Sequence, residues 1–146
     1  MRGAVLAVFF TACVGVLWYL HDPAWLIDQT TGLRPWHRAS DGTLSRWSGG
    51  HASFFVPSNL SQIRIPVSTT FDPREPGGER PMLVTFSIDD RRVGRVLLTG
   101  PGWQEVTLPM PPPGSRRVRR IDVRTNITRE DNHGVQIGQL CCFSSR

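Results

Sequence analysis

Short runs in which apolar and polar residues alternate recur about every ten residues from Leu44 onward, separated by glycine, proline, aspartate or asparagine. Such alternation places every second side chain on the same face of a β-strand. In one run, Ile121 and Val123 share one face, whereas Arg120 and Arg124 share the other. We find no helical period in this part of the sequence, so the chain is predicted to fold mainly into strands.

Eight such runs predict an all-β fold, an antiparallel β-sandwich of jelly-roll type with about eight strands. The predicted strands comprise residues 46–47, 52–56, 61–67, 82–88, 93–99, 102–110, 119–127 and 134–140. Turns are predicted at the glycine pair 49–50 and at residues 89–92, which would close a hairpin. The 12 prolines and 14 glycines agree with a fold of many turns and few helices.

The N-terminal segment differs from the rest, because residues 3–20 are apolar and carry no charge. A helix of this length spans about 27 Å, close to the hydrocarbon thickness of a bilayer. Trp18 and Tyr19 lie at its far end, where aromatic rings favour lipid headgroups, and Arg2 precedes it. We expect a retained, single-pass anchor in a bacterial inner membrane, with the N-terminus cytoplasmic and the C-terminal domain extracytoplasmic. Cleavage as a signal peptide and lipidation at Cys13 remain as alternatives.

These patterns divide the sequence into three parts. Residues 1–28 are the predicted membrane anchor, residues 29–43 a linker or capping loop, and residues 44–146 the β-sandwich domain. Within the domain, alternation directs Phe54 and Val56 inward and Phe55 to the opposite face. Phe55 therefore needs a cover, which we expect from residues 29–43.

The three cysteines predict neither a disulfide framework nor a metal site. Cys13 lies in the apolar segment, and Cys141 and Cys142 are adjacent, so they cannot cross-link separate elements. A strained disulfide between the adjacent pair remains open, and we expect no cofactor.

Three stretches of the sequence resemble a family of small bacterial β-sandwich domains. They are "RWSGG…FFVP", "VTFSIDDRRVGRVLLTGPGWQEVTLP" and "IDVRTNI…DNHGVQIGQL", between about Gly42 and Leu140. These domains are similar to carbohydrate-binding jelly rolls and occur on the outer side of membrane-embedded glycosyltransferases or behind a single anchor. The resemblance implies a glycan or a membrane glycosyltransferase as partner, and it carries over no catalytic or binding residue. Related sequences often have "DG" or "NG" where this chain has Asp89 and Asp90.

Three tryptophans are candidate platforms for a sugar ring: Trp36, Trp47 and Trp103. Aromatic faces bind the apolar C–H faces of sugars, and nearby carboxylates such as Asp89 and Asp90 could accept bonds from hydroxyl groups. The alternative for Trp47 and Trp103 is that each closes one end of the hydrophobic core. Trp36 could instead anchor at the membrane interface.

The densest charge is a run of arginines, for which we predict contact with an anionic surface: Arg116, Arg117, Arg119, Arg120 and Arg124. The net charge is +5, and nucleic acid is an improbable partner because the domain is expected outside the cytoplasm and no stacking aromatics are interleaved. Anionic lipid headgroups or acidic polysaccharide fit better. A solvated strand face is the alternative.

Catalysis is not expected, because no nucleophile lies in a recognisable motif and neighbouring carboxylates on a turn cannot face each other across a cleft. The sequence therefore favours a membrane-anchored, non-catalytic module that recognises glycan or assists a glycosyltransferase in the bacterial envelope. A structural module that docks onto another envelope protein and binds no sugar is the second hypothesis.

Overall fold

The computed structural model describes residues 2–21, 23–39, 41–70, 81–112, 114–128, 131–140 and 144–145. An α-helix, α1 (Arg2–His21), and a 3₁₀-helix, η1 (Ala24–Asp28), precede the strands. The ten strands are β1 (Thr30–Leu33), β2 (His37–Arg38), β3 (Leu44–Pro57), β4 (Leu60–Thr69), β5 (Met82–Ile88), β6 (Arg91–Leu98), β7 (Gly102–Pro109), β8 (Val118–Thr125), β9 (Gln136–Gly138) and β10 (Ser144–Ser145).

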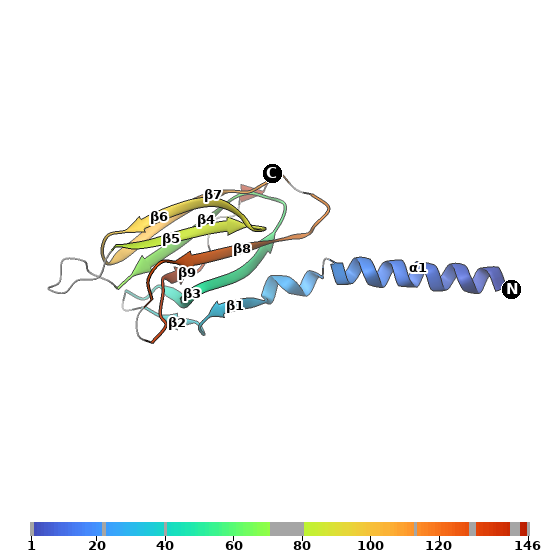
Figure 1. Ribbon diagram of the computed structural model, residues 1–146, viewed down its shortest axis with the longest axis horizontal. Helices are drawn as coiled ribbons and strands as arrows, with labels where there is room; N and C mark the ends of the chain where they lie inside the picture. The colour runs from blue at the N-terminus through green and yellow to red at the C-terminus, as the bar shows by residue number, and fades with distance from the viewer. Residues whose placement is uncertain are drawn as a thin grey trace.

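The strands form a sandwich of two antiparallel layers (Figure 1). One layer has the order β1-β3-β8-β5-β6, and the other contains β2, β3, β9, β4, β7 and β10. The all-β sandwich predicted from the alternating runs is thus confirmed, with ten strands in the described residues where about eight were expected. The predicted runs in the second half of the chain match the observed strands closely, and the last is shorter, limited to β9.

Strand β3 belongs to both layers, which corrects the prediction of a turn at the glycine pair. Its first half pairs with β9, where Trp47 faces Gln136, and its second half pairs with β8, where His51 faces Arg124. Gly49 and Gly50 lie at the change of partner, inside one continuous strand. Because they carry no side chain, the strand can bend there and pass from one layer to the other without a break.

The segment predicted as a linker or capping loop, residues 29–43, contains β1 and β2, and both pair with β3. Its polar, irregular sequence gave no strand signal. Gly32 has a φ of +66°, and a Cβ there would lie 2.1 Å from the carbonyl oxygen of His51. Only glycine allows this approach, which holds β1 against β3.

The hydrophobic core lies between the layers and is built from every second residue of the strands, as the alternation predicted. Phe86 and Ile63 are fully buried. Fully burying one such side chain stabilises the fold by about 1.5–3 kcal/mol. The other core residues with less than 2% exposure that the strands contribute are Ala52, Val56, Ile65, Val67, Met82, Val84, Ile88, Leu98, Leu108, Ile121 and Val123.

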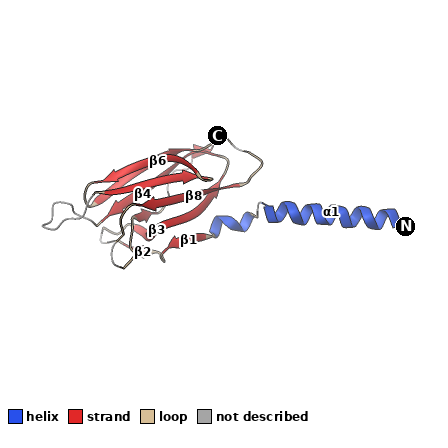
Figure 2. Cartoon of the chain, viewed as in Figure 1, coloured by secondary structure: helices blue, strands red, loops and turns tan. Residues whose placement is uncertain are grey.

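Helix α1 extends away from one end of the sandwich, and η1 lies between α1 and the first strand (Figure 2). The apolar side chains of α1 are exposed on all sides, with Val8, Phe9 and Phe10 each about 70% exposed. In the described part of the chain, no helix has both the length and the apolarity needed to cross a membrane. The end of α1 nearest the sandwich contacts the domain, where the Arg117 guanidinium lies 4.7 Å from the ring centre of Trp18.

The question of a disulfide between Cys141 and Cys142 lies outside the described residues. Cys13 is a free cysteine in α1.

Candidate functional site

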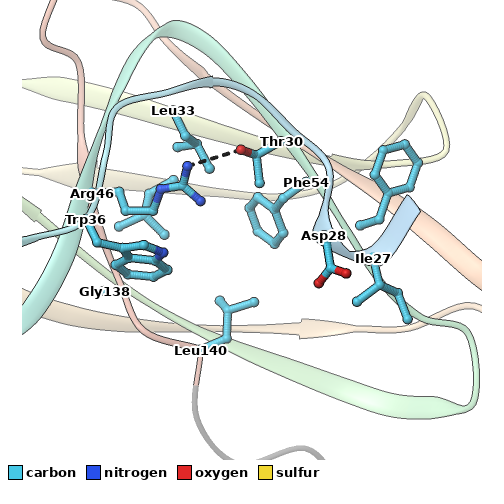
Figure 3. A pocket seen from close by; sticks show the side chains of 11 residues that line it. Ile27, Asp28, Thr30, Leu33, Trp36, Arg46, Phe54, Gly138 and Leu140 are labelled. Carbon is cyan, nitrogen blue, oxygen red and sulfur yellow. Dashed lines mark hydrogen bonds between the residues drawn. The ribbon is translucent and has the colours of Figure 1, made fainter. Parts of the chain in front are cut away.

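A pocket of about 280 Å³ opens where β1, β3 and β9 meet the end of η1 (Figure 3). We call it the aromatic pocket. Its walls come from segments that are distant in the sequence and that β3 brings together. It is lined by Ile27, Asp28, Thr30, Leu33, Trp36, Arg46, Phe54, Phe55, Ile137, Gly138 and Leu140.

Trp36 is the exposed aromatic side chain of this pocket, with 49% of its surface accessible. It follows β1 and lies beside Arg46 of β3, whose guanidinium carbon is 5.1 Å from the indole centre (Figure 3). This cation–π contact fixes the orientation of the ring. Arg46 is itself held by bonds that its Nε donates to the carbonyl oxygen of Arg34, at 2.9 Å, and that its Nη2 donates to Thr30 Oγ1, at 3.1 Å.

Partial burial of Arg46 lowers the pKa of its guanidinium, because desolvation disfavours the charged form. The pocket therefore combines apolar walls with a fixed cation and with the exposed carboxylate of Asp28. An indole face, a carboxylate and a guanidinium within one small concavity suit a ligand that has both C–H faces and hydroxyl groups.

A second and larger depression, of about 650 Å³, lies at the hairpin between β5 and β6 and the segment that leads into β8. We call it the arginine cleft. It is lined by Phe55, Ile88, Asp89, Asp90, Arg91, Pro111, Pro112, Arg116, Arg119 and Arg120. The structure thus brings five residues singled out in the sequence into one site: Asp89, Asp90, Arg116, Arg119 and Arg120.

Ion pairs occupy both carboxylates of the cleft. Arg119 Nη1 donates to Asp89 Oδ2 at 2.7 Å, and the backbone N–H of Arg120 donates to Asp89 Oδ1 at 3.0 Å. The Arg120 side chain contacts Asp90 and donates from Nε to Asp122 at 3.0 Å. The hydrogen bond with Asp122 raises the pKa of Arg120, so this guanidinium stays charged. The Nε of Arg119 is buried and has no hydrogen-bond partner among the described residues.

Phe55 lines both depressions, which therefore adjoin. It sits opposite Arg120 on the outer face of its layer, away from the core. Helix η1 packs against β3 and β8, and its residue Ile27 shares the aromatic pocket with Phe55. The cover expected from residues 29–43 thus comes in part from η1, a segment that was assigned to the membrane anchor.

Trp47 is not part of the core, which corrects the interpretation of this residue as a core plug. Its indole is half-buried and stacks with two imidazoles, that of His133 at 5.1 Å between ring centres and that of His37 at 6.3 Å. These rings come from the strand and loop on either side of β3. Because its own neighbours take up the ring surface, Trp47 is a poor platform for a sugar.

Trp103 lies at the start of β7 and lines neither depression. Its Nε1 donates to Asp41 Oδ2 at 2.6 Å, and its ring packs beside Gly138. The backbone N–H of Thr43 is the main cause that lowers the pKa of Asp41, and the Trp103 bond adds to it. Trp103 thus ties the loop before β3 to the second layer, and its ring is half-buried.

The remaining predicted residues are spread out. Arg117 precedes β8 and contacts Trp18 of α1, whereas Arg124 lies on the exposed face near the far end of β8. Arg46 and Asp28 were not predicted as site residues. Arg46 lies beside Trp47 in a predicted strand of two residues and belongs to no motif. Asp28 stands alone between an apolar and a polar stretch, so neither residue gave a signal.

No family model matches the sequence, and no curated protein matches it. Several solved structures are similar in fold. An acetyl xylan esterase from the rumen bacterium Butyrivibrio proteoclasticus superposes with a TM-score of 0.50 and 14% identity, over 82% of this chain and 31% of that chain. A family two carbohydrate esterase from Clostridium thermocellum, in complex with cellohexaose, has a TM-score of 0.46 and 9% identity, over 80% and 34% of the two chains.

A carbohydrate-binding module of family 36, in complex with calcium and xylotriose, has a TM-score of 0.42 and 16% identity, over 80% of this chain and 92% of that chain. This chain spans about a third of the length of the two esterases. At these identities, the likeness to the acetyl xylan esterase shows a shared sandwich fold and nothing about activity.

Proposed function

We propose that this protein is a membrane-associated, non-catalytic glycan-recognition module of the bacterial envelope, and that the aromatic pocket is its binding site. One observation carries the proposal: the pocket holds a fixed, half-exposed indole together with a cation and a carboxylate. Sugars need this combination, because each ring has apolar C–H faces and a rim of hydroxyl groups. The volume of about 280 Å³ is sufficient for a sugar residue.

The proposal of a non-catalytic role is supported by the state of the carboxylates. Asp89 and Asp90 pair with arginines in the cleft, and Asp28 is the one acidic residue among the described residues that line the aromatic pocket. Glycoside hydrolysis generally requires two carboxyl groups that flank the scissile bond. In this reading, the site holds a glycan while a partner enzyme, such as a membrane glycosyltransferase, acts on it.

Association with the membrane is proposed through α1, because a helix that is apolar on all sides is stable only when it is buried or in lipid. The apolar length of α1 would lie in lipid, and the sandwich would lie on the outer side of the bacterial inner membrane. Trp18 and Tyr19, both more than half exposed, would then lie at the headgroups next to the domain.

A glycan array tests the proposal, with the full chain in mild detergent and two tryptophan variants beside it. Trp36→Ala removes the platform, and Trp25→Ala is the matched control. Trp25 is 51% exposed in η1 and does not line the aromatic pocket, whereas Trp36 is 49% exposed. We expect the wild type and Trp25→Ala to retain the same glycans, and Trp36→Ala to bind them about fivefold more weakly, because a stacked aromatic face contributes on the order of 1 kcal/mol.

Two outcomes count against the proposal. One is that no envelope glycan is retained by the wild type. The other is that Trp36→Ala binds as strongly as the wild type while remaining folded by circular dichroism, which would place any sugar site elsewhere on the domain.

The second candidate function, docking onto another envelope protein without binding sugar, is favoured by exposed apolar side chains on η1. Trp25 and Ile27 are 51% and 43% exposed beside the pocket. The same pair of variants separates the two functions. A docking surface would lose its partner with Trp25→Ala as readily as with Trp36→Ala, whereas a glycan site would be affected by Trp36→Ala alone.

A further inference from the structure

The arginine cleft has more positive than negative charge among the side chains that line it. Four guanidinium groups, those of Arg91, Arg116, Arg119 and Arg120, share it with two carboxylates. Arg119 and Arg120 are engaged by aspartates. The side chains of Arg91 and Arg116 are exposed, and neither forms a hydrogen bond or ion pair within the described part of the chain. Two guanidinium groups of the cleft thus have no ion-pair partner among the described residues.

The cleft also has a defined place relative to α1. Arg117, adjacent to Arg116, contacts Trp18 near the end of the apolar helix, with 4.7 Å between the guanidinium and the ring centre. The segment between β7 and β8 lies at the end of the sandwich from which α1 extends (Figure 1). If α1 lies in lipid with Trp18 at the interface, Arg116 and the cleft lie at the depth of the lipid phosphates.

From this charge and this position, we propose that the arginine cleft binds the phosphate headgroup of an anionic membrane lipid, with Arg91 and Arg116 as the free ligands. Guanidinium groups bind phosphate oxygens in a bidentate manner and are the preferred partners of this group. The fixed ion pairs of Arg119 and Arg120 hold the walls of the cleft. Phosphate of a soluble molecule has the same chemistry, and the test below separates the two sources.

This inference rests on the proposed membrane association of α1, and it extends the proposed function. The cleft adjoins the aromatic pocket at Phe55. A lipid headgroup in the cleft would hold the pocket close to the membrane surface, where a membrane-attached glycan begins. Glycan recognition at the pocket could fail without affecting lipid binding at the cleft, because the two sites have different residues apart from Phe55.

Native mass spectrometry of the full chain in mild detergent provides the test, with equimolar phosphatidylglycerol and phosphatidylcholine of the same acyl chains. We expect the wild type to retain phosphatidylglycerol in preference. The double variant Arg91→Gln with Arg116→Gln should lose this preference, by roughly fivefold for each arginine. Both side chains are exposed and unbonded, so the variant should unfold at the same temperature as the wild type.

The matched control is Arg95→Gln with Arg124→Gln. It removes the same charge from two exposed arginines that flank Thr85 on the outer face, neither of which lines the cleft. The control should keep the wild-type preference. If both double variants lose it equally, the effect is one of net charge and the cleft proposal is wrong. An unchanged preference in the cleft variant also overturns it.

Two further arms separate the sources and the assumptions. Inorganic phosphate is added as a competitor at the concentration of the lipid, and full displacement of phosphatidylglycerol would overturn the assignment to lipid. Flotation of the full chain with vesicles of phosphatidylcholine alone tests α1 independently of the cleft. If the chain floats with these vesicles but shows no preference for phosphatidylglycerol in native mass spectrometry, the membrane association stands and the cleft site is refuted.

Discussion

The indole of Trp103 donates its hydrogen bond to the carboxylate of Asp41, 62 residues earlier in the chain. This bond shows how single side chains tie the layers of a small sandwich together at their rims. It also gives a structural role to Trp103, which the sequence alone presents as a candidate sugar platform. A buried or rim tryptophan usually finds a partner for its N–H, and here the partner is an exposed loop carboxylate.

The lowered pKa of Asp41 predicts how this contact responds to pH. Donors bonded to the ionised carboxylate favour its charged form, so the contribution to stability is present above the ordinary pKa of 3.8 and is lost as the pH falls through the lower folded value. The indole N–H resonance of Trp103, followed by NMR, should shift with a midpoint below 3.8. The indole of Trp25 serves as the control and should not follow this titration. A Trp103 midpoint at or above 3.8 would contradict the prediction.

At the scale of elements, the hairpin between β5 and β6 departs from the usual turn chemistry. Asp89 and Asp90 both have positive φ, 47° and 68°, and Ile88 pairs directly with Arg91. These values define a two-residue turn of type I′, for which asparagine followed by glycine is the common sequence. The two aspartates keep this turn because arginines of β8 contact their carboxylates.

The two turn positions should respond differently to glycine. Glycine adopts the left-handed conformation at position 90 without the strain of about 1 kcal/mol that a non-glycine residue has there. Asp90→Gly loses only an ion pair whose carboxylate is 82% exposed. We expect a small rise in the free energy of unfolding, by up to about 1 kcal/mol. Asp89→Gly should lower it, because Asp89 accepts bonds from both Arg119 and the backbone of Arg120.

Urea unfolding of the full chain in detergent, followed by circular dichroism, measures both changes. If the two variants shift the midpoint in the same direction, the prediction that the bonds of Asp89 stabilise the turn more than those of Asp90 is wrong.

At the scale of the whole molecule, the core that stabilises the sandwich is formed without α1. Among the described residues, every member of the buried core lies between Phe54 and Ile137, and α1 contributes none. The side chain of Trp18 near the end of α1 contacts Arg117, which lies at the exposed end of the domain. Helix η1, by contrast, packs on β3 and β8 and forms a wall of the aromatic pocket.

A chain that begins at Pro23 should therefore fold in water without detergent, with an unfolding temperature within a few degrees of the full chain. A chain that begins at Thr30 lacks η1 and should be less stable, because Phe55 then loses part of its cover. Thermal unfolding and gel filtration of the two truncated chains measure this difference. Equal stability of both would mean that η1 is not part of the folded domain.

The sequence by itself determined the fold class and the position of most strands. Alternation over five or more residues, as in Ile63, Ile65 and Val67, leaves only a strand with one buried face, so the all-β sandwich and most of its strands followed from the pattern. The hairpin at Asp89 followed in the same way from the polar break between two apolar runs. These features are local, and local sequence is sufficient to specify them.

Only the tertiary structure decided which residues form a site. The aromatic pocket joins Asp28, Trp36 and Arg46, and the arginine cleft joins the turn at Asp89 with residues of β8. These neighbours are brought together by strand pairing across long stretches of chain, and no spacing in the sequence records such pairing. The physical reason is that β3 continues through its glycine pair and belongs to both layers. One continuous strand therefore pairs with β9 and with β8, and it brings together segments that are distant in the sequence.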